Sequence, residues 1–98
     1  MDDLFVRQID ILKGAMGDYR RGALGLNSLI QRIEGVSEML DMPEWKDAIY
    51  PIVLSLETIN AFALGANKGL TEADTISVEN SLLMLEKLIG RFQTRTGN

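Results

Sequence analysis

The sequence predicts an all-α protein, a four-helix antiparallel up-down bundle with a proline-kinked third helix. Three segments repeat apolar residues at helical spacing, while no segment alternates apolar and polar residues as a strand does. The segments between the expected helices are short, and short connections favour antiparallel neighbours. Because the chain has 98 residues and neither an internal repeat nor a long linker, we expect one domain over residues 1–98.

The first helix is expected from about Asp2 to Tyr19. Its apolar residues follow the 4-3-4-3 spacing of a single helix face: Phe5, Ile9, Leu12, Met16 and Tyr19. Acidic residues at its start suit the positive end of the helix dipole, and Arg20 and Arg21 suit the negative end. Gly22 is the expected stop, since glycine readily adopts the left-handed conformation that often follows a helix.

The second helix is expected from Leu26 or Ser28 to Leu40, with Asn27 and Ser28 as candidate N-caps. Its apolar face consists of Leu26, Leu29, Ile30, Ile33, Val36 and Leu40. The segment Asp41-Met42-Pro43 ends the helix, because the residue before a proline avoids helical geometry.

The third helix is expected from Pro43 or Glu44 to about Gly65, with Pro51 inside it. A proline in a helix interior removes one backbone hydrogen bond and clashes with the preceding turn. We therefore expect a kink near residues 47–51, or two helices that meet there.

This third helix is rich in apolar residues, which make up 12 of the 17 positions from Ala48 to Leu64. Such a helix lies either at the centre of a bundle or against a second chain, and we favour the central position. Asn60 falls among the apolar positions, so we expect it to find a hydrogen-bond partner such as a neighbouring helix end. Trp45 shares the apolar arc and is expected in the core, whereas Tyr50 lies off that arc and is an interface candidate.

The fourth helix is expected to begin at Thr71-Glu72-Ala73-Asp74. Thr71 is the N-cap, and Asp74, three residues later, completes an approximate capping box. The apolar face again has 4-3-4-3 spacing: Val78, Leu82, Leu85, Ile89 and Phe92. Residues Thr94 to Asn98 are expected to fray.

Composition excludes several kinds of active site. The chain has no histidine and no cysteine, so it has no Ser-His or Cys-His nucleophile, no thiol chemistry, no disulfide and no ordinary zinc site. It also has no Glu-x-x-His motif for a di-iron bundle and no glycine-rich phosphate loop, and its basic residues avoid the apolar faces. We therefore expect no enzymatic activity, no cofactor and no metal.

The charge of the chain indicates the kind of partner. The net charge is −4, which repels nucleic acids and anionic membranes and matches a basic protein partner. No apolar run approaches the ~18–20 residues of a membrane span. The start, Met-Asp-Asp, has no basic segment, so we expect no secretory signal and a cytoplasmic location.

The excess of negative charge is concentrated in the middle of the chain. Residues 34–57 contain six acidic residues against one basic residue, Lys46, whereas the remaining charges nearly cancel. One interpretation is a docking surface, because such charge raises the rate and selectivity of association; the other is a solvated turn. For the docking surface, the candidate partner-binding residues are Glu38, Asp41, Glu44, Asp47 and Tyr50.

One segment resembles small helical bacterial toxin-immunity proteins of the colicin D immunity type. This segment, Arg20–Glu34, contains a Gly-x-Leu-x-Leu turn followed by a leucine-spaced helix, and the later Glu44-Trp45-Lys46-Asp47 is compatible with the same family. The resemblance implies a toxin inhibitor that binds and blocks a cognate toxin, often a basic nuclease, by mimicking acidic substrate charge. It carries over no inhibitory residue.

The expected function is therefore that of a small acidic binding protein that neutralises or docks a basic protein partner, such as a toxin domain. The alternative is a structural or regulatory helical homodimer without catalytic activity, with the third helix at the interface.

Overall fold

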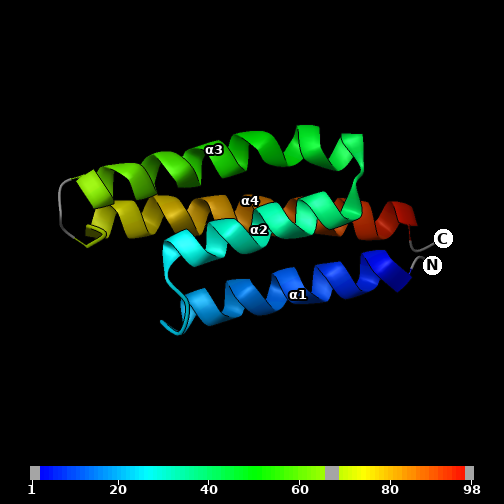
Figure 1. The fold of residues 1–98 in the computed structure, drawn as a ribbon, viewed down its shortest axis with the longest axis horizontal. Helices are drawn as coiled ribbons and strands as arrows, with labels where there is room; N and C mark the ends of the chain where they lie inside the picture. Colours follow the sequence, from blue (N-terminus) through cyan, green and yellow to red (C-terminus); the bar gives the residue numbers. More distant parts are fainter. Residues whose placement is uncertain (1–2, 66–68, 97–98) are drawn as a thin grey trace.

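The structure is a computed structural model that describes residues 3–65 and 69–96. Within these ranges it contains four helices and no strand: α1 (Asp3–Arg20), α2 (Leu26–Leu40), α3 (Pro43–Gly65) and α4 (Glu72–Thr96). Each helix runs antiparallel to the one before it in an elongated bundle of 45 × 25 × 19 Å (Figure 1). α1 packs on α2, α2 on α3 and α3 on α4, with α1 and α3 at opposite edges. The predicted four-helix up-down bundle is confirmed.

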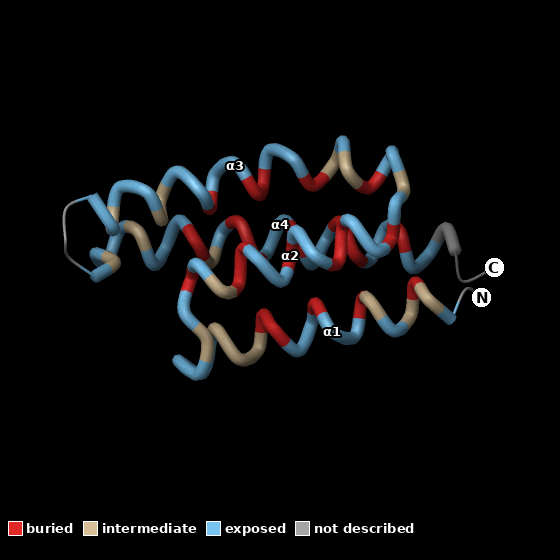
Figure 2. Tube along the Cα trace, in the orientation of Figure 1, coloured by how far each residue is buried: buried red, intermediate tan, exposed pale blue. Residues whose placement is uncertain are grey.

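The core consists of the apolar faces that the sequence predicted (Figure 2). Every residue predicted for the apolar faces of α2 and α4 is buried, and of the residues predicted for α1 only Tyr19 is partly exposed. Trp45 is fully buried, and its ring meets Phe92 of α4 edge-on with the ring centroids 5.3 Å apart. Its predicted position in the core is confirmed.

Gly22 ends α1, as the sequence predicted. Its φ of +79° is in the left-handed region that glycine occupies without steric cost. The N–H of Ala23 donates to the carbonyl of Asp18 at 2.8 Å, and the N–H of Gly22 donates to that of Tyr19 at 3.0 Å. These two bonds form a Schellman motif, which satisfies the last carbonyls of the helix.

The expected N-caps of α2 are wrong. Gly25 is the cap, in an extended conformation and without a side-chain bond, so Asn27 and Ser28 lie inside the first turn. Leu26 is buried, and we attribute the early start to its packing in the core, which outweighs the preference of polar residues for the cap. Asn27 instead accepts a hydrogen bond of 3.2 Å from the amide of Asn60. Asn60 thus finds the neighbouring helix end that was expected for it, although it is half-buried.

α3 is one continuous helix that passes through Pro51, so the alternative of two helices is wrong. In Figure 1 it bows gently along its length. Our favoured interpretation of α3 as the central helix is also wrong, because it lies at an edge and packs mainly on α2 and α4. Several of its large apolar side chains therefore remain exposed: Tyr50, Leu54, Phe62 and Leu64.

The expectation that no apolar segment approaches the length of a membrane span needs a qualification for α3. By length and composition, this helix of 23 residues is long and apolar enough to cross a membrane. Length and composition alone do not distinguish a spanning helix from the core helix of a bundle. In this structure its buried face packs into the core through Trp45, Ile49, Ile52, Val53 and Leu56.

The start of α4 is a reciprocal capping box, as predicted. The hydroxyl of Thr71 accepts a bond from the N–H of Asp74 at 3.0 Å, and the Asp74 carboxylate accepts one from the N–H of Thr71 at 3.1 Å. The C-terminal end differs from the prediction, because the helix continues to Thr96 rather than fraying from Thr94. Residues 97–98, which were also expected to fray, lie outside the described residues.

Candidate functional site

A groove of about 220 Å³ lies between α2 and α3 in the acidic middle of the chain. Its apolar floor is formed by Ile49 and Val53, and its polar rim carries side chains of both helices. Glu34 and Glu38 lie one turn apart on α2, and Lys46 and Tyr50 lie one turn apart on α3. The helical repeat thus aligns two side chains of each helix along the groove.

The groove is held at its base by a buried hydrogen-bond chain between the two helices. The Ser37 hydroxyl donates to the carbonyl of Ile33 at 2.9 Å and accepts from the indole N–H of Trp45, also at 2.9 Å. No buried side-chain nitrogen or oxygen in the described part of the chain lacks a partner. The Ser37–Trp45 bond therefore fixes the start of α3 against α2 without leaving an unsatisfied polar group.

Asp41, a predicted site residue, shapes the turn between the two helices. It has a φ of +47°, which is uncommon outside glycine but tolerated by aspartate. Its N–H donates to the Ser37 carbonyl at 3.1 Å. Its carboxylate lies 3.1 Å from the Lys46 ammonium, and this hydrogen bond raises the pKa of Lys46. Asp41 therefore caps the C-terminal end of α2 and forms an ion pair with Lys46, the one basic residue between residues 34 and 57.

Lys46 also lies 3.8 Å from Glu38, another predicted site residue. The carboxylates of Asp41 and Glu38 are both highly exposed, so these ion pairs add little to stability. Their main effect is on the charge of the groove, because they hold the Lys46 ammonium close to Asp41 and Glu38. Glu34 lines the rim and makes no hydrogen bond or ion pair with any residue that the structure describes.

The structure separates the other three predicted residues. Tyr50 lies on the groove rim with its side chain 65% exposed, which keeps it available for contact. Asp47 is exposed on α3 but does not line the groove. Glu44 faces the opposite side of α3, in a hollow shared with Arg91 and Phe92 of α4. The structure therefore keeps Glu38 and Tyr50 at the groove, with Asp41 linked to it through Lys46, and places Glu44 and Asp47 outside it. Glu34 joins the residues at the groove.

A second charged cluster, which the sequence analysis missed, joins α1 to α4. Arg20 binds two carboxylates, with Glu79 at 2.8 Å and Glu86 at 3.1 Å. Burial and the nearby Glu79 raise the pKa of Tyr19 beside it. The hydrogen bonds from Arg20 lower the pKa of Glu86 below its ordinary value of 4.5. These residues lie 59 and 66 positions apart, so no local pattern reveals the cluster.

The cluster predicts a pH dependence of stability. A carboxyl group whose pKa is lowered by folding stabilises the protein above its unfolded pKa, and the effect is lost as the pH falls through its folded pKa. We expect Glu86→Gln to lower the melting temperature at pH 7, with the difference from wild type vanishing at a pH well below 4.5. The exposed side chains limit the loss to about 1 kcal/mol or less.

Thermal melts of both proteins across this pH range measure the effect, with Glu57→Gln as the control for losing a charge alone. A parallel pH dependence of wild type and Glu86→Gln would show that the Arg20–Glu86 pair contributes nothing to stability.

Comparison with protein-family models, curated proteins and solved structures finds no match for this chain. Among the described residues, no group of three or more acidic side chains is placed to hold a metal ion. The α2–α3 groove is the candidate site on its own geometry. It combines an apolar floor, an exposed aromatic ring and two carboxylates one helical turn apart.

Proposed function

We propose that this protein is a small immunity-like binding protein that docks and neutralises a basic protein partner at the α2–α3 groove. The observation that carries the proposal is the position of Glu34, Glu38 and Tyr50 around one groove. Lys46, the only basic residue between residues 34 and 57, lines the same groove and forms an ion pair with Asp41.

The groove suits an arginine or lysine side chain of the partner. Such side chains bury their aliphatic stems on apolar surface and keep the charged head in a polar environment. Ile49 and Val53 offer the apolar floor, and the carboxylates of Glu34 and Glu38 offer acceptors for charge-assisted hydrogen bonds. The exposed ring of Tyr50 is available for a cation–π contact.

The charge distribution supports the same proposal over longer distances. Acidic residues gathered in one region attract a basic partner before contact and raise the association rate. This attraction weakens with salt, because the Debye length falls from about 10 Å at 0.1 M to about 3 Å at 1 M. The resemblance to toxin-immunity proteins points to a partner of the same kind, a basic toxin domain.

The test compares two charge reversals that change the net charge equally. Glu34→Lys acts at the groove rim, whereas Asp10→Lys acts on an exposed residue of α1. The partner is sought by capture with the tagged protein from the cells that produce it, and as the product of the reading frame immediately upstream. Association is then followed at low and high salt by surface plasmon resonance.

We expect Glu34→Lys to slow association by about tenfold at low salt, which corresponds to about 1.4 kcal/mol, and by much less at high salt. Asp10→Lys should keep most of the wild-type rate, since it alters net charge but not the groove. Equal effects of the two variants would show that net charge, and not this groove, attracts the partner. An unchanged rate for Glu34→Lys would contradict the proposed site.

A further inference from the structure

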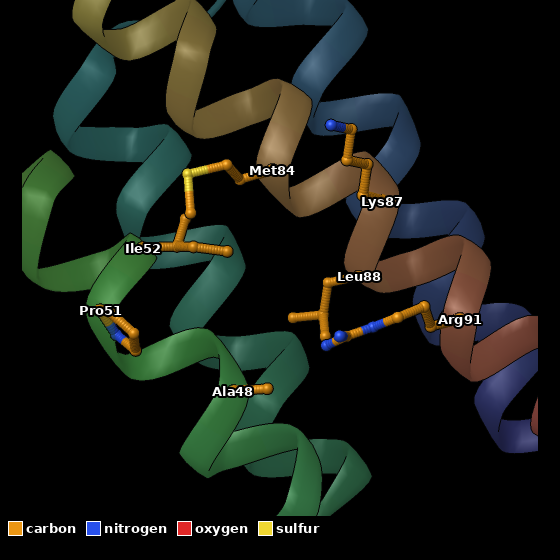
Figure 3. Close-up of a pocket in the computed structure, with 7 residues that line it drawn as sticks. All are labelled: Ala48, Pro51, Ile52, Met84, Lys87, Leu88 and Arg91. Atoms are coloured by element: carbon orange, nitrogen blue, oxygen red, sulfur yellow. The ribbon is translucent and has the colours of Figure 1, made fainter.

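A second groove, of about 310 Å³, lies on the other side of α3, where this helix packs on α4 (Figure 3). Pro51 and Ile52 of α3 and Met84 and Leu88 of α4 make it apolar. In Figure 3 the Met84 side chain points toward Ile52, and the side chain of Arg91 extends past Leu88. This surface joins α3 and α4 and is separate from the α2–α3 groove.

The exposed face of α3 on this side has an ordered pattern along its length. Successive residues of a helix are rotated by about 100°, which places a set of side chains of α3 on this one face. Along the chain, this set consists of two acidic residues, Pro51, two hydroxyl residues and an aromatic residue. In chain order they are Glu44, Asp47, Pro51, Ser55, Thr58 and Phe62, all of which are exposed.

The adjoining face of α4 has the complementary pattern in reverse chain order. Its exposed side chains are Arg91, Lys87, Met84, Leu83, Asn80 and Ile76. Since the helices are antiparallel, these patterns run in the same direction along the bundle. Glu44 lies level with Arg91, because both line one hollow, and Pro51 lies level with Met84 in the next. Acidic residues are thus level with basic ones at one end of the face, Ser55 is level with Asn80 in the middle, and Phe62 lies within about one turn of Ile76 at the other end.

We propose that a second copy of this chain binds across the α3–α4 face, related by a two-fold axis parallel to the helices. Rotation about this axis does not change the position of a residue along the bundle, so each residue of the second copy lies at the same height as in the first. The rotation also places α3 of one copy on α4 of the other. Asp47 then meets Lys87 of the second copy, and Phe62 lies within about one turn of Ile76, at both symmetric contacts. The self-complementary pattern of charge favours a second copy over an unrelated partner.

The extent and exposure of the face are sufficient for a dimer. From Glu44 to Phe62 the face is about 27 Å long, and two helices make it about 20 Å wide. Taken as flat, this face is about 540 Å², so two copies would bury about 1,080 Å² together, just above the ~1,000 Å² that a specific interface requires. The face also exposes large apolar side chains that the core does not use, with Phe62 74% and Met84 and Ile76 each 56% exposed.

The test uses two charge reversals on this face. Asp47→Lys and Lys87→Glu change exposed residues whose side chains have no hydrogen bond or ion pair with any residue that the structure describes, so folding should be preserved, and circular dichroism checks it. Sedimentation equilibrium should show a wild-type dimer. Each variant alone should be at least tenfold weaker in dimerisation, because like charges meet at both contacts. Asp10→Lys and Lys13→Glu, matched reversals on α1, should leave the dimer intact.

Mixing the two variants is the decisive part of the experiment. A mixed dimer pairs the two substituted side chains at one contact and retains the native pair at the other, so dimerisation should return. A wild-type protein that is monomeric up to millimolar concentration would overturn the proposal. So would a dimer that neither reversal weakens, or a mixture that stays monomeric. The α2–α3 groove remains open in this dimer, so none of these outcomes tests the proposed docking function, which has an experiment of its own.

Discussion

Replacing Trp45 with alanine is expected to lower the free energy of unfolding by about 3–5 kcal/mol. The indole is fully buried and packs edge-on against Phe92, so its removal leaves a large cavity between α3 and α4. The substitution also removes the N–H that donates to Ser37 at the base of the α2–α3 groove. Since a domain of this size is stabilised by only about 5–15 kcal/mol, the loss is a large share of the total.

Urea denaturation followed by circular dichroism measures this loss. Trp45→Phe keeps an aromatic ring in the core but not the hydrogen bond, so we expect its loss to be intermediate. Tyr50→Ala removes an exposed aromatic side chain from the same helix and should change stability by about 0.5 kcal/mol or less. Equal midpoints for Trp45→Ala and Tyr50→Ala would contradict the packing of α3 in this structure.

The second large effect is expected for Leu85→Ala, which should cost about 2–5 kcal/mol. Leu85 is fully buried on α4, whereas Leu83 of the same helix is 47% exposed. Leu83→Ala is therefore a matched control that deletes the same atoms from the opposite face, and it should cost much less. Urea titration of both variants decides the orientation of α4. Similar losses for the two would contradict it.

Local features of the fold were predictable from the sequence. The apolar faces of α1, α2 and α4 follow from helical spacing, because the repeat of 3.6 residues places them on one side regardless of the rest of the molecule. The stop at Gly22 and the capping box of Thr71 and Asp74 are also local, since each involves bonds within a few residues.

Features that depend on how the helices pack together were not predictable. The pattern of α3 shows that it is apolar but not that it lies at an edge, because its position depends on all four helices. The start of α2 depends on how Leu26 packs in the core, which outweighed the capping preference of Asn27 and Ser28.

The candidate site was predictable in part for the same reason. The spacing of Glu34 and Glu38 is visible in the sequence, since residues four apart lie on one side of a helix. The tether from Asp41 to Lys46 and the bond from Trp45 to Ser37 depend on the turn between α2 and α3, which only the structure shows. Because that same packing turns Glu44 toward α4, it does not share the groove with Glu38.

Photocrosslinking from position 50, in the cells that produce the protein, tests most directly whether the α2–α3 groove binds a partner. A benzophenone amino acid replaces Tyr50 at the groove rim, and a control places it at Ile11, which is 48% exposed on α1. We expect a crosslink to a basic protein from position 50, none from position 11, and loss of the first when Glu34→Lys is added. No crosslink from position 50, or the same product from both positions, would contradict the groove as the docking site.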